Sequence, residues 1–298
     1  MKEFNYKKID AFATLNSVGN PAGYVLLNEN QTITEAEMLE IAREQKGFVN
    51  EVGFVCRKSN ELLELKYYSA EREVDFCGHA TIAILYDILK HQTEFTDQQT
   101  LSIQTKRGLL TVYNHIASED AVFIMSPVPT YRNDAPNGGD ICWHLGIIPS
   151  DIDTNWPISI INAGLNTLIV PIIGLKAILD INPDLTGLKN FCVENKIDII
   201  EVFCTEVSST KSDYRTRVFA PTFGYLEDPA TGSGNSAFGY YLLKLGKWTK
   251  EGLTIEQNNQ PEKFNVVKLQ KTIDSEQLER VLFGGSAITR IEGKYFIY

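Results

Sequence analysis

Two segments of the chain repeat one local pattern: a strand, an acidic turn, a glycine and then a helix. In residues 67–90 (YYSAEREVDFCGHATIAILYDILK) the glycine is Gly78, and in residues 217–246 (RVFAPTFGYLEDPATGSGNSAFGYYLLKLG) it is Gly232. Aligning the two glycines places Ala83 opposite Ala237. Such self-similarity is typical of a fold built from two related halves. A chance likeness between two amphipathic helices is the alternative that the sequence leaves open.

Most of the remaining chain reads as short strands. Stretches of four to eight apolar or alternating residues, such as AGYVLL, EVGFVCR and IIEVFCTE, recur between turn formers. Helices are few: residues 32–47, capped by Thr32 or Thr34, and residues 185–196 are the others predicted. Strands without strict βαβ alternation favour an α+β fold.

The halves are predicted to divide near residues 126–145. The segment SPVPTYRNDAPNGGD is rich in turn formers and charge, as domain boundaries often are. We therefore expect an N-terminal lobe of residues 1–126, joined by the C-terminal strand 282–298, and a C-terminal lobe of residues 127–281.

Composition excludes several functional classes. The net charge of −10 argues against nucleic-acid binding. No apolar stretch is long enough for a membrane span, and the N-terminus lacks the apolar core of a secretory signal. The cysteines are widely spaced without a CxxC pair, so no disulfide framework or zinc motif is predicted: Cys56, Cys77, Cys142, Cys192 and Cys204. We expect a cytoplasmic protein.

The two glycine turns predict a site for a small anion. The first N–H groups of a helix have no intrahelical partner and carry partial positive charge. A preceding glycine lets a ligand approach them without meeting a Cβ atom. The segment around Gly232 lacks the lysine of a P-loop, the GxSxG of a nucleophile elbow and the GxGxxG of a dinucleotide site.

Polar residues at these turns are the candidates for proton transfer. His79 begins a helix, where the positive field lowers the imidazole pKa and favours the neutral form. Asp228 either caps its helix or is catalytic, and Ser233 either satisfies a backbone donor or contacts substrate. Three arginines are weaker candidates for binding an anionic group: Arg72, Arg215 and Arg217. They could equally be solvent-exposed residues on strands.

At four places the sequence resembles the PhzF-like proteins of phenazine biosynthesis. The motifs DAFATLNSVGNPAGYVLL, NEVGFV, EREVDFCGHATIAI and RVFAPTFGYLEDPATGSGNSA occur in the family's order and spacing. The resemblance implies a fold related to diaminopimelate epimerase: two pseudo-symmetric lobes, each with a curved, mostly antiparallel β-sheet around a central helix, and an active site between them. It also implies a homodimer with a biosynthetic role that acts on a small carboxylated metabolite without cofactor or metal.

The resemblance also implies roles for individual residues. It identifies Glu51 as the catalytic glutamate, which a lone Glu at the head of a strand would not suggest by itself. The other residues that match are catalytic His79 and Asp228, and substrate-binding Gly78, Gly232 and Ser233. Asn50 takes a position where the family often has serine and is expected to bind substrate as well.

Related epimerases use one thiol from each half, and here Cys77 precedes Gly78 whereas Thr231 precedes Gly232. Threonine cannot act as a thiolate, so an isomerase with one glutamate as base and acid is favoured. We expect Cys77 to pack as a small apolar residue. An epimerase that uses Glu51 or Cys77 with a second base, and a catalytically idle binding protein, remain alternatives.

One segment departs from the family pattern. Gln257 is present, but Asn258 stands where the family has glycine, and the family's following arginine is missing from residues 255–270. This puts the substrate in doubt more than the fold.

Overall fold

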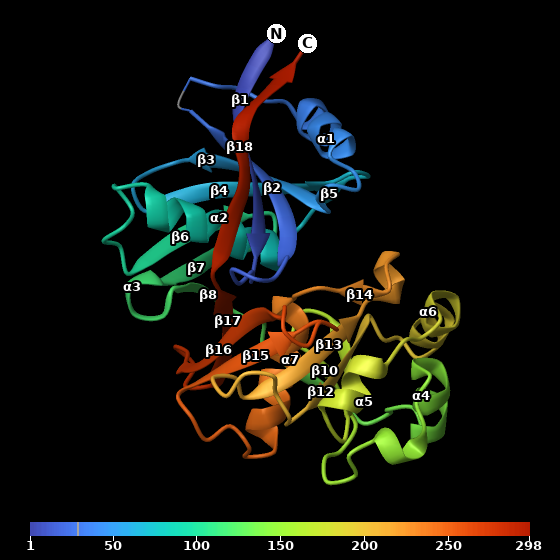
Figure 1. Ribbon diagram of the computed structural model, residues 1–298. Helices are drawn as coiled ribbons and strands as arrows, with labels where there is room; N and C mark the ends of the chain where they lie inside the picture. Colours follow the sequence, from blue (N-terminus) through green and yellow to red (C-terminus); the bar gives the residue numbers. More distant parts are fainter. Residues whose placement is uncertain (29) are drawn as a thin grey trace. The chain divides into compact units, whose positions relative to one another are not determined.

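The computed structural model describes residues 1–28 and 30–298, and the chain in it divides into two units (Figure 1). The first unit comprises Met1–Met125 and Gly284–Tyr298, and the second comprises Ser126–Phe283. Each wraps β-strands around one long helix. No helix in the described part of the chain is long and apolar enough to cross a membrane.

The first unit is a mixed, mostly antiparallel sheet. Its strands pair in the order β18–β1–β2–β3–β4–β6–β7–β8, and only β2–β3 and β4–β6 are parallel. The elements are β1 (Lys2–Ala11), β2 (Asn20–Leu27), α1 (Glu35–Glu44), β3 (Glu51–Arg57), β4 (Leu62–Ser69), β5 (Glu73–Val74), α2 (Gly78–His91), β6 (Thr100–Thr105), β7 (Gly108–His115), α3 (Ile116–Glu119), β8 (Ala121–Met125) and β18 (Ala287–Ile297).

The second unit repeats this pairing scheme. The order β9–β10–β11–β12–β13–β15–β16 has its parallel pairs, β11–β12 and β13–β15, at the corresponding places. The elements are β9 (Thr130–Arg132), α4 (Gly138–Leu145), β10 (Ser159–Asn162), β11 (Asn166–Pro171), α5 (Leu175–Asp180), α6 (Leu185–Glu194), β12 (Ile199–Cys204), β13 (Tyr214–Phe219), β14 (Glu227–Asp228), α7 (Gly232–Lys244), β15 (Gly252–Gln257), β16 (Asn265–Ile273) and β17 (Glu279–Gly285), with 3₁₀ turns at Pro149–Asp151 and Pro221–Phe223. The repeat seen in the sequence is therefore a repeat of structure, and the predicted α+β class is confirmed.

A buried helix forms the centre of each unit. Every residue of α2 from Ala80 to Leu89 is buried, and so is α7 from Gly234 to Leu242. A helix that is covered on all sides belongs to a core rather than to a surface. In both helices the glycine is the first helical residue, and a short strand, β5 or β14, precedes it.

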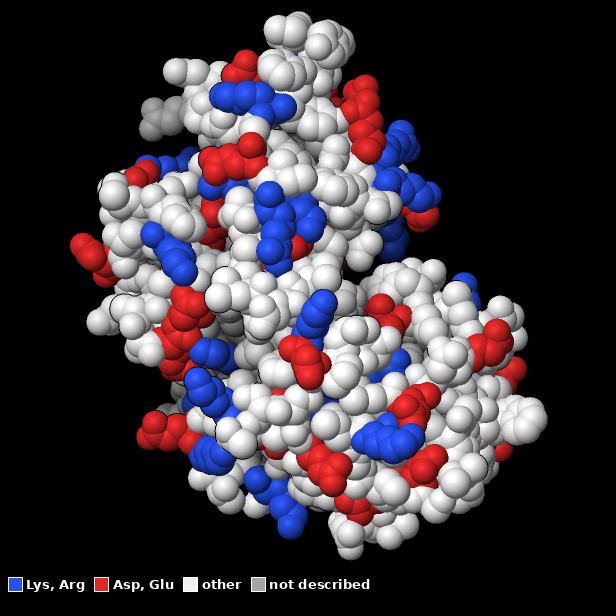
Figure 2. Space-filling view, in the orientation of Figure 1, with Lys and Arg blue, Asp and Glu red and all other residues white. Residues whose placement is uncertain are grey.

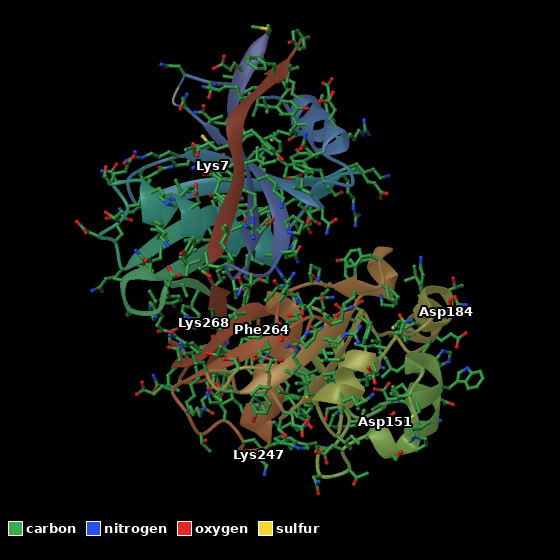
Figure 3. All side chains as sticks on the ribbon, viewed as in Figure 1. Lys7, Asp151, Asp184, Lys247, Phe264 and Lys268 are labelled. Atoms are coloured by element: carbon green, nitrogen blue, oxygen red, sulfur yellow. The ribbon has the colours of Figure 1, made fainter. Side chains whose placement is uncertain are left out.

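Inside the first unit, Asp87 joins α2 to the strands around it. Its carboxylate accepts hydrogen bonds from Tyr24 (2.6 Å) and Thr289 (3.0 Å) and pairs with Lys7 at 3.0 Å. Lys7 is labelled in Figure 3. Burial acts to raise the pKa of Asp87, but the hydrogen bonds from Tyr24 and Lys7 outweigh it and hold the pKa below the ordinary value. The buried charge is therefore stabilised by partners on β1, β2 and β18.

In the second unit, Arg215 and Glu256 form an ion pair at 3.0 Å with both side chains fully buried. Backbone N–H groups of Ser208 and Ser209 donate to Glu256, and the Arg215 guanidinium lies 5.5 Å from the ring centre of Phe264.

Arg217 is also buried and pairs with Glu227 at 2.9 Å. It donates further hydrogen bonds to backbone carbonyl groups, including that of Ile181 at 2.6 Å. Neither Arg215 nor Arg217 is an exposed strand residue, and the guanidinium groups of both are engaged within the unit.

Two local predictions have different outcomes. Thr34, one of the two residues predicted to cap this helix, is the N-cap of α1 and forms a capping box with Glu37. The segment 126–145 is predicted to hold a turn-rich boundary between the halves; the second unit begins at its first residue, Ser126, but β9 and a helix, α4, that Asn137 caps lie within it. The asparagine and glycines that suggested a loop are the N-terminal signal of that helix.

Glu201, in the middle of β12, is an unusual buried acid. Its side chain is fully buried, and neither carboxyl oxygen has a hydrogen-bond partner in the described part of the chain. Its Oε2 atom would lie only 2.5 Å from a Cβ atom added to Gly234 in the first turn of α7. Burial raises the pKa of Glu201 well above its ordinary value, so the folded protein holds this side chain neutral.

We predict that Glu201→Gln stabilises the protein increasingly as pH rises. The unfolded chain releases this proton near a pKa of about 4.3, whereas the folded chain keeps it. Wild-type stability therefore falls as pH rises from that value towards the raised folded pKa, and the amide does not titrate. Above about pH 5, the difference in free energy of unfolding should grow by about 1.4 kcal/mol per pH unit for as long as the folded carboxyl stays protonated, as measured by urea denaturation at a series of pH values.

Exposed Glu61 provides the control, because Glu61→Gln should shift stability by a constant amount or not at all. If the free energies of unfolding of wild type and Glu201→Gln change in parallel with pH, Glu201 is not neutral in the folded protein.

Candidate active site

Three candidate side chains, those of Glu51, Cys77 and His79, meet in the first unit at the start of α2. Glu51 Oε2 lies 3.4 Å from His79 Nε2, and Cys77 Sγ lies 3.4 Å from His79 Nδ1. Glu51 Oε2 is buried and accepts no hydrogen bond within the described residues, while 21% of the side chain is exposed. The lone pairs of this oxygen are therefore not engaged by a donor within the described residues.

Secondary structure fixes each of these groups. Glu51 is the first residue of β3 and is paired with Ala22 on β2 and Ser69 on β4. Cys77 is the N-cap residue of α2, and its carbonyl accepts hydrogen bonds from both the amide and the hydroxyl of Thr81. The side chains are thus presented from a central strand and a helix end rather than from a loop.

Electrostatics favour a neutral imidazole at His79. Burial lowers the pKa of His79, while the Glu51 charge and a backbone contact with Pro21 oppose that effect without overcoming it. The predicted direction is confirmed, but burial is the main cause, rather than the field of the helix. Cys77 is buried as expected, yet its sulfur contacts the imidazole and so is not simply packed among apolar groups.

The second unit carries the other predicted residues at the start of α7. Asp228 is half-buried on β14 opposite Val218, and its carbonyl accepts a hydrogen bond from Gln257. Gly232 is buried and Ser233 is partly exposed. A Cβ atom on Gly232 would lie 2.1 Å from the Phe283 ring, so close packing by itself requires glycine here.

The remaining predicted residues flank the first group. Gly78 begins α2, and Asn50 is exposed immediately before β3. Arg72 is exposed and lines a hollow of about 600 Å³ together with Lys106 and Arg107. Phe76, the residue before Cys77, also lines this hollow.

On the face drawn in Figure 2, acidic and basic side chains alternate over the described surface without a continuous basic tract.

Residues 9–293 match the model of one protein family, described as phenazine biosynthesis-like protein (PhzC-PhzF). The chain belongs to this family. A Bacillus subtilis relative named "Uncharacterized isomerase YfhB" is 30% identical over 91% of both chains. The Escherichia coli "Uncharacterized isomerase YddE" is 26% identical over 97% of both.

Solved structures show the same fold. The Bacillus anthracis phenazine biosynthesis protein of the PhzF family has 27% sequence identity and a TM-score of 0.86, with 100% of both chains covered. A probable proline racemase from Agrobacterium radiobacter, at 12% identity and a TM-score of 0.59, shares the fold alone; 99% of this chain and 93% of that one are covered. The PhzF fold is therefore shown over the whole chain.

The departure from the PhzF pattern at residues 257–258 has a structural explanation. Gln257 is fully buried, and its Oε1 accepts hydrogen bonds from the Thr231 amide (3.0 Å) and the Asn235 side chain (2.7 Å). Asn258 has a φ of +123°, a conformation that glycine adopts most easily. The Asn258 carbonyl accepts hydrogen bonds from Arg215, the arginine of the buried ion pair with Glu256. These hydrogen bonds hold the backbone at Asn258 in place.

We predict that Gln257→Ala destabilises the second unit. Two buried donors, the Thr231 amide and the Asn235 amide group, would lose their shared acceptor, at a cost of about 1–3 kcal/mol each. The exposed neighbour Gln260 gives a matched control, since Gln260→Ala removes a side-chain hydrogen bond that is exposed. Chemical denaturation that shows equal stability for the two variants would contradict this role.

Proposed function

We propose that this PhzF-family protein is an isomerase that moves a proton on a small carboxylated substrate, with Glu51 as base and then as acid. The observation that carries the proposal is the Glu51–His79 pair. A carboxylate oxygen free of hydrogen bonds lies 3.4 Å from an imidazole whose pKa is lowered by burial. A positioned base and a neutral hydrogen-bonding partner suit proton abstraction next to a carboxyl group.

The relatives support the reaction class. Two relatives that cover more than nine tenths of the chain are named isomerases, although neither name states a substrate. The proposed chemistry transfers only a proton and so needs no redox cofactor. We propose that Asp228 orients the substrate, and that the backbone amides at Gly78, Gly232 and Ser233 bind its carboxylate, as the N-terminal turns of helices do.

A second candidate, an epimerase, is favoured by the Cys77–His79 contact. A thiol 3.4 Å from an imidazole nitrogen has a partner that can take its proton. Thr231 occupies the matching position before Gly232 and cannot supply a second thiolate. One carboxylate acting on one face of the substrate therefore fits the residues better than two thiols acting on opposite faces.

Solvent deuterium tests the proposal. The protein is incubated in D₂O with a panel of unsaturated carboxylates, including cyclohexadiene carboxylates, and with amino acids such as proline. We expect deuterium at an acceptor carbon of an isomerised product, detected by NMR and mass spectrometry. Glu51→Gln should reduce this incorporation by roughly 10² to 10⁴, the usual worth of a positioned acid or base.

Controls separate the candidates. Glu61→Gln, at an exposed position of the same unit, should keep wild-type exchange. Exchange at a stereocentre that is lost in Cys77→Ser would instead support the epimerase. Saturable binding of a panel member without any exchange would support a binding protein and overturn the proposed isomerase.

A further inference from the structure

Glu51, Cys77 and His79 offer three different donor atoms at one place. A carboxylate oxygen, a thiol sulfur and an imidazole nitrogen all lie within 4.8 Å of one another. All three residues belong to the first unit, so the arrangement is complete within it. Cys77 is 7% exposed, and the side chain of His79 is 12% exposed.

The three donor atoms are close enough together for one ion to bind them after a local side-chain rotation. Zinc bonds of about 2.0–2.3 Å in a tetrahedral arrangement put neighbouring ligand atoms roughly 3.3–3.6 Å apart. His79 Nε2 lies 3.4 Å from Glu51 Oε2 and 3.9 Å from Cys77 Sγ. Cys77 Sγ lies nearer to Nδ1, at 3.4 Å, so a rotation of the Cys77 side chain is needed to bring the sulfur to an ion held on Nε2.

The donor types select the kind of metal. Thiolate and imidazole ligands favour zinc, cobalt and cadmium, whereas magnesium and calcium prefer sites made of oxygen atoms. Three protein ligands leave a fourth position for water or a carboxylate, the pattern of an open zinc site. The strand and helix that carry the donors also limit their movement, which lowers the cost of assembling the site.

We propose that Glu51, Cys77 and His79 form a binding site for a thiophilic divalent cation, Zn²⁺ above all, and that the bound ion inhibits proton transfer by Glu51. Binding forms one bond each from the metal to sulfur, nitrogen and oxygen, displaces metal-bound water and releases the Cys77 proton to solvent. The proposed metal site does not depend on the proposed function, whereas the proposed inhibition does.

Cadmium titration of the full-length, reduced protein tests the site. We expect one equivalent of Cd²⁺ to produce the ultraviolet thiolate-to-cadmium charge-transfer band, and Zn²⁺ to displace it. Millimolar Mg²⁺ should leave the band unchanged. Cys77→Ser should abolish the band, and His79→Gln should weaken Cd²⁺ binding by about 100-fold or more, since losing a ligand exceeds the 10- to 100-fold typical of an outer partner.

Cys56→Ser is the matched control, because Cys56 is the half-buried cysteine of the same unit. It should keep both the band and the affinity. Circular dichroism confirms that each variant is folded. A band that survives in Cys77→Ser, or the lack of any band in wild type, would overturn the site.

A separate measurement addresses inhibition. Once an exchanging substrate is found, one equivalent of Zn²⁺ should suppress deuterium incorporation in wild type, and a chelator should restore it. Stoichiometric binding with unchanged exchange would overturn the inhibition while leaving the site in place. Wild-type exchange in Glu51→Gln would instead refute the proposed function, and the cadmium band would still decide the metal site.

Discussion

Burial of one helix along almost its whole length is the constraint on which each unit depends. Because strands cover α2 and α7 on their sides, apolar residues fill these helices all round, and a ligand cannot reach their sides. The helix start is different, since a short strand and a glycine lead into it and its first N–H groups have no intrahelical acceptor. The core that stabilises the unit thereby determines where chemistry can take place.

Buried charges show which polar groups serve the fold. Asp87 and Arg215 are buried, and each is surrounded by partners on several elements. Glu51 and Glu201 are the two carboxylates of the described chain with a buried oxygen that lacks a hydrogen bond. Glu201 is sealed completely, whereas Glu51 is 21% exposed. Of the two, Glu51 is therefore the one whose side chain a ligand can approach, which is why the proposal rests on it.

Local signals predicted the parts of the structure that local physics controls. The glycine turns, the Thr34 cap and most of the strands follow from turn chemistry and apolar pattern. The role proposed for Glu51 could not be predicted in this way, because a glutamate at the head of a strand is usually solvated. Its contact with His79 also joins residues that are distant in sequence. Only the family motif indicated Glu51. Helix α4 was missed because Asn137 and the glycines after it read equally as a loop. Glu201 left one signal, a single acid inside the apolar run IIEVFC.

The repeat also shows where the two halves differ in their side chains. Matching positions before the helix glycines hold Cys77 in one unit and Thr231 in the other. The Thr231 amide is held by buried Gln257, while Cys77 turns its sulfur toward His79. The first half therefore places a thiol, an imidazole and a carboxylate together, and the second half has a hydrogen-bonded turn at the matching place. The proximity of a carboxylate, a thiol and an imidazole thus supports both proposals, proton transfer by Glu51 and binding of a soft metal ion.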